Sequence, residues 1–250
     1  MIRLIPVGTG AAFGEPGQVQ SCYLVLAGPR RIVLDLGSGS LSALARHMAP
    51  EDLDAVVISH LHPDHCVDLF GLHVRMQWGP GRGRVIPVHG PPALAARLAA
   101  FADGERWRPE DGLDLRPLPG GGGTVDLGDG VLLRHREVPH LPPTHAVRVE
   151  AGGRALVYGA DCAPDDALVE LAAGADVLVC ECTFGADPVP AEVPHLPAEA
   201  AGSIARRAGV GRLLLTHMQL GHDRGRALAV AAEAFGGPVA WAEDGVEVVV

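Results

Sequence analysis

The sequence predicts an α/β fold in which two β-sheets stack face to face and helices cover their outer faces. Strand-like apolar runs occur in the first half of the chain and again in the second half, and helix-like segments are interleaved with them. The chain has 250 residues, 48% of them hydrophobic, so it can bury a large core. We therefore expect one domain that spans residues 1–250.

The elements follow one another along the chain with clear breaks. Gly120–Gly123 is expected to form a flexible turn between strands. Strands are predicted at Ile2–Val7, Ser21–Leu26, Arg31–Asp35, Ala55–Ser59, Val85–Val88, Val131–Val138, Ala146–Glu150, Ala155–Tyr158, Val177–Cys182 and Leu213–Thr216. Helices are predicted at Leu41–Met48, Val67–Gln77, Pro91–Ala102, Asp165–Ala173, Ala198–Ala208 and Gly225–Ala234.

The stretch His60-Leu61-His62-Pro63-Asp64-His65 carries the strongest functional signal. It follows the apolar run Ala55–Ile58 and offers three imidazoles and one carboxylate within six residues. Nitrogen and oxygen ligands on one short loop at a strand end are typical of a zinc site. The alternating spacing allows His60 and His62 to point one way while Asp64 and His65 face the other side. The segment can therefore serve two metal ions.

Composition excludes several classes of protein. The net charge is −10 and all 20 basic residues are arginine, which disfavours general nucleic-acid binding. The five cysteines form no CxxC pair and no disulfide scaffold, and no signal peptide precedes the first strand, so we expect a reducing cytoplasm. No run of 18 apolar residues occurs, so no transmembrane helix is expected. Cys66 and Cys162 each follow a candidate ligand, and we expect them to be buried spacers.

The His-x-His-x-Asp-His motif resembles the metal signature of the metallo-β-lactamase superfamily, and other segments are similar to its ribonuclease Z-like branch. Val7–Ala12 resembles the opening strand and glycine turn of that branch, and Ile32–Gly39 resembles its next strand and turn. The resemblance covers nearly the whole chain. It implies a metallo-β-lactamase-like four-layer αββα sandwich and a dinuclear metal centre.

The resemblance supplies further ligand candidates. His140 lies eight residues before Arg148, as in the family, although His135 and His145 remain alternatives. Asp161 matches the bridging aspartate, with a helix N-cap as its alternative role. His217 matches the last family histidine better than His222. The resemblance groups His60, His62 and His140 at one metal and Asp64, His65 and His217 at the other, with Asp161 between them.

Two more residues are predicted to serve catalysis. Glu181 stands within an apolar strand, where a carboxylate is costly unless it is paired. His195 is the candidate partner, because it precedes a helix entry that resembles the branch, with Pro197 in place of the usual hydroxyl residue. An exposed loop histidine without a role is the alternative. The resemblance implies that His195 donates a proton to the leaving group and that Asp64 also assists the attacking water.

The sequence therefore indicates a metal-dependent hydrolase, most simply a phosphodiesterase that uses a metal-bridging hydroxide on a small phosphodiester. A lactone or acyl-ester hydrolase and a non-enzymatic metal-binding scaffold are the alternatives. Imidazole-rich ligation favours two Zn²⁺ ions, with manganese, nickel or iron as alternatives. Only 20 residues separate His140 from Asp161, which leaves no room for the basic arm that grips transfer RNA in ribonuclease Z. We expect a small-molecule substrate, no transfer RNA and no membrane partner; a homodimer is compatible with the sequence.

Overall fold

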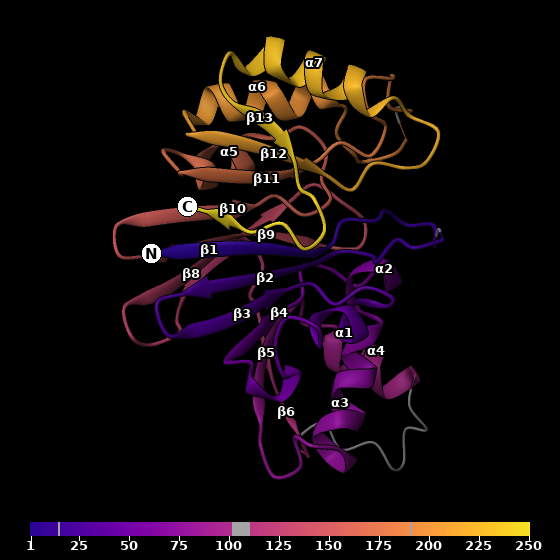
Figure 1. Ribbon diagram of the computed structural model, residues 1–250, viewed down its shortest axis with the longest axis vertical. Helices are drawn as coiled ribbons and strands as arrows, with labels where there is room; N and C mark the ends of the chain where they lie inside the picture. Colours follow the sequence, from indigo (N-terminus) through magenta and orange to yellow (C-terminus); the bar gives the residue numbers. More distant parts are fainter. Residues whose placement is uncertain (15, 102–110, 191) are drawn as a thin grey trace.

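The computed structural model describes residues 1–14, 16–101, 111–190 and 192–250, and it contains two seven-stranded sheets (Figure 1). The first sheet has the order β14-β1-β2-β3-β4-β5-β6 and the second β13-β12-β11-β10-β9-β8-β7. The first comprises β1 (Ile2–Gly8), β2 (Cys22–Ala27), β3 (Arg30–Leu34), β4 (Ala55–Val57), β5 (Ile86–Gly90), β6 (Leu113–Pro117) and β14 (Val248–Val249). The second comprises β7 (Gly122–Asp126), β8 (Val131–Val138), β9 (Thr144–Ala151), β10 (Arg154–Tyr158), β11 (Val177–Glu181), β12 (Arg212–Thr216) and β13 (Val239–Trp241).

Each sheet is mixed, with an antiparallel part and a parallel part. Strands β1 to β3 pair antiparallel and β3 to β6 pair parallel, while β7 to β10 pair antiparallel and β10 to β13 pair parallel. Parallel strands end at the same sheet edge, so the loops that follow β10, β11 and β12 lie side by side. This edge carries the candidate residues Asp161, Glu181 and His217.

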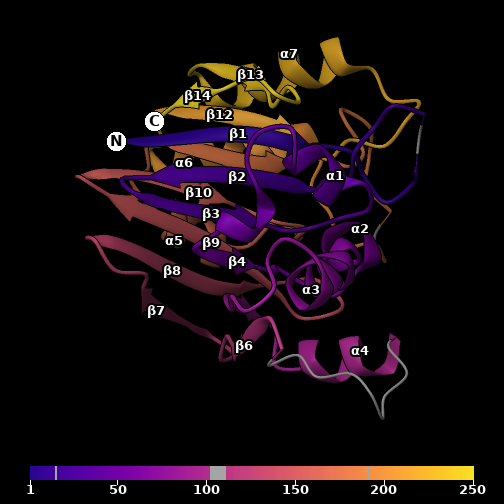
Figure 2. The ribbon, with the colours of Figure 1, turned by 60° about the horizontal axis from the view of Figure 1, so that its bottom comes forward.

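Three hydrophobic clusters produce the four layers. One lies between the sheets and includes Ile2, Tyr23, Val149 and Leu156. A second packs the first sheet against the helices α1 (Ser40–Leu44), α3 (Asp68–Trp78) and α4 (Leu94–Phe101). The third packs the second sheet against α5 (Asp166–Ala172), α6 (Ala198–Ala208) and α7 (Arg224–Phe235). Figures 1 and 2 show these two helix sets on opposite sides of the stacked sheets, as the four-layer αββα prediction requires.

The shared core between the sheets supports the proposal that residues 1–250 form one domain. The chain ends also lie together, because β14 pairs with β1 at the edge of the first sheet (Figure 1). Among the described residues, no helix is long and apolar enough to cross a membrane.

Several predicted elements need correction. The predicted helix Leu41–Met48 is only the short α1, because the chain after Leu44 continues as turns. The short helices α2 (Pro63–Cys66) and η1 (Pro50–Asp52) were not predicted. Helix α4 begins three residues after Pro91, and the predicted end of that helix at Ala102 lies outside the described residues.

The glycine run is part turn and part strand. Gly122 and Gly123 belong to β7, although Gly120–Gly123 was expected to be a turn throughout. Strands β6, β7, β13 and β14 were all absent from the sequence prediction, and they form the four edges of the two sheets.

Candidate metal centre

The candidate residues come from the ends of strands in both sheets. His60 and His62 lie in the loop after β4, and Asp64 and His65 lie on α2, whose first residue is Pro63. Proline suits this first helical position, because its fixed φ fits a helix and its missing N–H would have no helical partner there. His140 follows β8, Asp161 follows β10, and His217 follows β12.

Left-handed residues turn the chain at three of these strand ends. Asp35 after β3 has φ 60°, Ala160 after β10 has φ 54°, and His217 after β12 has φ 56°. A non-glycine residue seldom adopts this conformation, and such residues are enriched at functional sites. Here each turn leaves a strand next to a polar cluster, so the sharp change of direction places side chains at the sheet edge.

The structure brings the predicted ligands together in two overlapping groups. One group consists of His60, His62, His140 and Asp161, and the other of Asp64, His65, Asp161 and His217. Within each group one ligand atom of every residue lies within 4.8 Å of the others. Asp161 belongs to both groups, which is the arrangement implied by the family resemblance. The ligand role itself remains a prediction.

In the first group, three ring nitrogens converge. His62 Nδ1 lies 3.0 Å from His60 Nε2 and 3.4 Å from His140 Nε2. In the second group, His217 Nε2 lies 3.2 Å from both His65 Nε2 and Asp64 Oδ2. Asp161 Oδ2 lies 3.4 Å from His65 Nε2 and 3.9 Å from His60 Nε2, so this carboxylate faces histidines of both groups.

These separations fit divalent-metal ligation. Nitrogen and oxygen ligands bound to Zn²⁺ at about 2.0–2.1 Å in a tetrahedron stand roughly 3.3 Å from one another. The contacts between ring nitrogens lie close to this value. Lone pairs that face one another across such distances need a proton or a cation between them, so the donor set fits a metal centre.

Hydrogen bonds on the far side of each ring fix which nitrogen faces the centre. His140 Nδ1 donates to the carbonyl of Pro194 at 2.9 Å, and His65 Nδ1 donates to Asp35 Oδ2 at 2.8 Å. Since a carbonyl and a carboxylate can only accept, the Nε2 lone pair of each ring is free to bind a cation.

Two hydroxyl groups fix the orientation of two more rings, those of His60 and His217. Ser59 Oγ donates to Asp35 Oδ2 and therefore accepts from His60 Nδ1, which lies 3.0 Å away. Thr183 Oγ1 donates to Glu181 Oε2 and accepts from His217 Nδ1 at 3.1 Å. Both histidines are thereby held with Nε2 toward the centre.

Asp35 is the buried residue to which the sequence analysis assigned no role. It has no exposed surface and accepts hydrogen bonds from the Ser59 backbone N–H, the Ser59 hydroxyl, Tyr158 Oη and His65 Nδ1. The signal that could have revealed it was a carboxylate at the end of the apolar run Ile32–Leu34, since a buried carboxylate requires partners. Thr183 and Ser59 carried no comparable signal.

The electrostatics of the centre favour a bound cation. Burial lowers the pKa of His60, His62 and His140, so these rings stay neutral. Burial acts to raise the pKa of Asp64, but the close contacts with the His217 and His65 rings outweigh it and hold the pKa below its usual value. Burial likewise acts to raise the pKa of Asp161, and His217 and His65 keep it well below its usual value. Neutral imidazoles beside ionised carboxylates are the ligand forms that bind metals.

Glu181 and His195 form the predicted pair beside this cluster. His195 Nδ1 donates to Glu181 Oε1 at 2.8 Å and lies 4.0 Å from Asp161 Oδ2. Glu181 is buried and also accepts from the Cys162 backbone N–H and from Thr183. Burial acts to lower the pKa of His195, but the hydrogen bond and charge of Glu181 outweigh it and raise that pKa. His195 is thus paired rather than a free loop residue, and its Nε2 is the atom left for a substrate.

The alternative histidines lie elsewhere. His135 and His145 face each other on β8 and β9, with their Nδ1 atoms 3.4 Å apart, and neither belongs to the two ligand groups. His222, which lies in the loop before α7, pairs with Asp187. The alternative N-cap role of Asp161 is taken by Asp165, whose side chain accepts from the Ala167 backbone N–H. Cys66 and Cys162 are buried in hydrophobic clusters, as expected of spacers.

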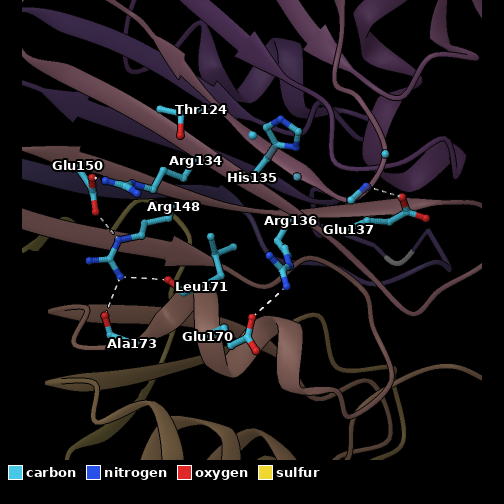
Figure 3. Close-up of a pocket in the computed structure, with 14 residues that line it drawn as sticks. Thr124, Arg134, His135, Arg136, Glu137, Arg148, Glu150, Glu170, Leu171 and Ala173 are labelled. Atoms are coloured by element: carbon cyan, nitrogen blue, oxygen red, sulfur yellow. Dashed lines mark hydrogen bonds and ion pairs between the residues drawn. The ribbon is translucent and has the colours of Figure 1, made fainter.

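A cavity of about 1070 Å³ lies away from this cluster, beside β8, β9 and α5 (Figure 3). Arg134 and Arg148 both donate to Glu150, and Arg136 donates to Glu170 on α5. Arg148 also donates to the carbonyls of Leu171 and Ala173. Arg136 and Arg148 thus link the second sheet to α5, and each of the three guanidiniums already pairs with a carboxylate.

A family model described as "Beta-lactamase superfamily domain" matches residues 30–218, which includes every candidate ligand. The chain belongs to the metallo-β-lactamase superfamily. It is 36% identical to the "Uncharacterized protein ML1173" of Mycobacterium leprae (strain TN) over 245 residues, which cover 95% of this chain and 85% of the relative. It is 31% identical to the "Probable metallo-hydrolase YhfI" of Bacillus subtilis (strain 168), with 87% of each chain covered.

Within this superfamily, the chain is related to the ribonuclease Z-like branch. The "Ribonuclease Z" of Mycobacterium bovis (strain BCG / Pasteur 1173P2) is 31% identical, with 87% of this chain and 86% of the relative covered. The crystal structure of YhfI superposes with a TM-score of 0.88 at 26% identity and covers 99% of this chain and 98% of its own. The prediction of the fold and of its family is confirmed, and the chain is a metal-dependent hydrolase of this superfamily.

Proposed function

We propose that this protein is a dinuclear metal-dependent phosphodiesterase that hydrolyses a small phosphodiester. The observation that carries the proposal is the Glu181–His195 pair, which stands next to Asp161 with His195 Nε2 left for a substrate. A proton donor beside a metal centre suits the departure of an alkoxide, which is a poor leaving group. The relative named Ribonuclease Z, by its name, acts on RNA, whose backbone is a phosphodiester.

In this proposal, His60, His62 and His140 would hold one cation, Asp64, His65 and His217 would hold the other, and Asp161 would be shared by both. Two Zn²⁺ ions would lower the pKa of a water molecule and offset the charge of the phosphoryl group. Asp64 also accepts the proton of the attacking water. His195, oriented by Glu181, donates its proton to the leaving oxygen.

A small substrate fits the surroundings of the centre better than transfer RNA. Strands β9 and β10 are joined by only Gly152 and Gly153, so no arm can project between them. The net charge of −10 opposes the approach of a polyanion. The five cysteines are all free and buried, which supports our proposal of a reducing compartment such as the cytoplasm.

The test is a substrate panel on protein of measured metal content. We would compare a bis-aryl phosphodiester, cyclic nucleotides, an aryl phosphomonoester and a lactone, using the wild type and His195→Ala, with His222→Ala as the matched control. His222 is a partly buried loop histidine outside the cluster. We expect phosphodiester hydrolysis that His195→Ala reduces and His222→Ala does not. Turnover of the lactone without turnover of any phosphodiester would overturn the proposal in favour of an acyl hydrolase.

A further inference from the structure

A second cavity, of about 710 Å³, lies directly beside the candidate centre. Its lining includes His140 and His195, one from the metal cluster and one from the proton-donor pair. It is also lined by five prolines, Pro139, Pro164, Pro190, Pro194 and Pro197. This space therefore lies next to the ring to which we assign protonation of the leaving oxygen.

The wall of the cavity offers few polar contacts. A proline has no backbone N–H, so each of the five removes a donor that could bind a phosphate, a sugar or a base. Leu141, Val189 and Val193 supply aliphatic surface. Among the lining residues that the structure describes, Glu192 is the only acidic one and there is no arginine.

The charge of this wall contrasts with that of the cavity in Figure 3. That cavity is lined by three arginines and three glutamates, whereas the cavity beside His195 has one carboxylate and no guanidinium. A second phosphate or another anionic group would therefore meet an apolar surface and Glu192. An uncharged group would lose little hydration and gain contact with the prolines.

Hydrogen bonds fix this wall relative to the catalytic pair. The backbone N–H of Val193 donates to the Pro190 carbonyl, and that of His195 donates to the Val193 carbonyl. The Pro194 carbonyl accepts from His140 Nδ1. The proline wall is thereby tied to both the metal cluster and the proton donor, so it is pre-organised for binding.

We propose that this cavity is the leaving-group subsite and that it takes an uncharged, predominantly apolar group such as an aromatic ring system. This inference rests on the phosphodiesterase function proposed above. In the reaction, the oxygen of water bonds to phosphorus and the bond from phosphorus to the leaving oxygen breaks. Asp64 takes a proton from the water, His195 gives one to the leaving oxygen, and the products are a phosphomonoester and a free alcohol or phenol.

The test uses methyl phosphodiesters of three phenols of similar acidity: phenol, 2-naphthol and 4-hydroxybenzoate. We expect kcat/KM to rise by about tenfold or more from phenyl to naphthyl, as hydrophobic pockets discriminate added carbons, and to fall for the carboxylated ester. Equal kcat/KM for the three esters would overturn the subsite. If the metal-loaded protein hydrolysed no phosphodiester at all, the proposed function would fail first.

Variants locate the effect in the cavity. Val193→Asp should abolish the preference for naphthyl over phenyl, while Val85→Asp, a substitution of a 55% exposed valine outside this cavity, should keep it. Leu141→Asp is a second cavity variant that cannot disrupt the core, because Leu141 is 78% exposed. An unchanged preference in both cavity variants would overturn the assignment.

A binding measurement separates the cavity from the chemistry. The product 2-naphthol should bind the wild type, as followed by its fluorescence, with and without added Zn²⁺. Leu141→Asp and Val193→Asp should weaken this binding by about tenfold, and Val85→Asp should not. Equal binding by all four proteins would overturn the subsite even if phosphodiesters are hydrolysed.

Discussion

Replacing Asp35 by asparagine tests whether an outer hydrogen-bond partner controls the metal centre. Asp35 does not belong to the ligand groups, but its carboxylate accepts four hydrogen bonds in a fully buried position. Asparagine has nearly the same shape and replaces one acceptor oxygen by an NH₂ donor. The change therefore removes an acceptor and a charge without opening a cavity.

Either orientation of the new amide leaves a buried donor without an acceptor. If the NH₂ group takes the place of Oδ1, it faces the backbone N–H of Ser59; if it takes the place of Oδ2, it faces His65 Nδ1–H and Tyr158 O–H. An unsatisfied buried donor costs about 1–3 kcal/mol of folding free energy. His65 can avoid this clash by moving its proton to Nε2, but it then loses the lone pair that faces the centre. We expect the metal affinity to fall by roughly 10–100-fold.

The assay measures metal affinity by competition with a chromophoric chelator and stability by chemical denaturation. Asp114→Asn is the matched control, because Asp114 is an exposed residue of β6 that pairs with the exposed Arg116. We expect Asp35→Asn to weaken metal binding and lower the free energy of unfolding, and Asp114→Asn to change neither. Wild-type metal affinity in Asp35→Asn would refute the argument that Asp35 orients His65.

Further predictions address the metal, the two catalytic side chains, pH and RNA. Zinc-replete protein should contain about two equivalents of metal by elemental analysis and lose activity on chelation; active protein without metal would contradict the centre. Asp64→Ala should lose both turnover and metal affinity. His195→Ala should keep its metal and lose turnover by roughly 10²–10⁴ for poor leaving groups, but less for nitrophenolate; an equal loss for both would show that His195 is not the acid. Burial first, and then His145 and His89, lower the pKa of His135 to about 4, so the unfolded chain binds its proton at higher pH than the folded protein does. Stability should be fully present above the ordinary histidine pKa and fall by on the order of 1–3 kcal/mol as pH drops to about 4. His135→Gln should remove that part of the pH dependence in denaturation curves, and an unchanged profile would contradict it. A transfer-RNA precursor at physiological salt should not be cleaved at a rate comparable to a small phosphodiester.

The interior strands were predictable because their side chains alternate or form continuous apolar runs. The predicted bounds of β8 match the observed ones. Its alternating sequence corresponds to alternating burial, with Val131, Leu133 and His135 buried and Arg134 and Arg136 exposed. The four edge strands were not predictable from the same signal. Strands β13 and β14 have three and two residues, and β7 begins with glycines at its exposed edge. An edge strand packs on one neighbour only, so its sequence is weakly constrained.

The ligand groups could be predicted as a set, but the choice of His140 needed the family pattern. Three histidines lie close together in sequence at positions 135, 140 and 145, and their spacing alone does not separate them. The structure separates them by strand geometry. His135 and His145 lie on paired strands and face the core, whereas His140 lies in the loop between those strands, where it reaches His62. A loop position at the sheet edge is what brings His140 to the cluster.

The partners that orient the ligands show where reading a sequence locally falls short. Glu181 was identified because a carboxylate inside an apolar strand needs a partner, and the same reasoning applies to Asp35 at the end of β3. Ser59 and Thr183 lack such a signal, because a hydroxyl is common at strand ends and its hydrogen bonds depend on the next strand. The register Glu181↔Thr216 in the parallel pair β11–β12 sets Thr183 and His217 side by side just beyond the strands. The Thr183 hydroxyl accepts a hydrogen bond from His217 Nδ1 and donates one to Glu181, so one side chain links the metal cluster to the proton-donor pair. Thr183→Val should therefore remove the hydrogen bonds that orient His217 and that hold Glu181, the partner of His195. Thr183→Ser keeps the hydroxyl and should preserve the orientation of both histidines.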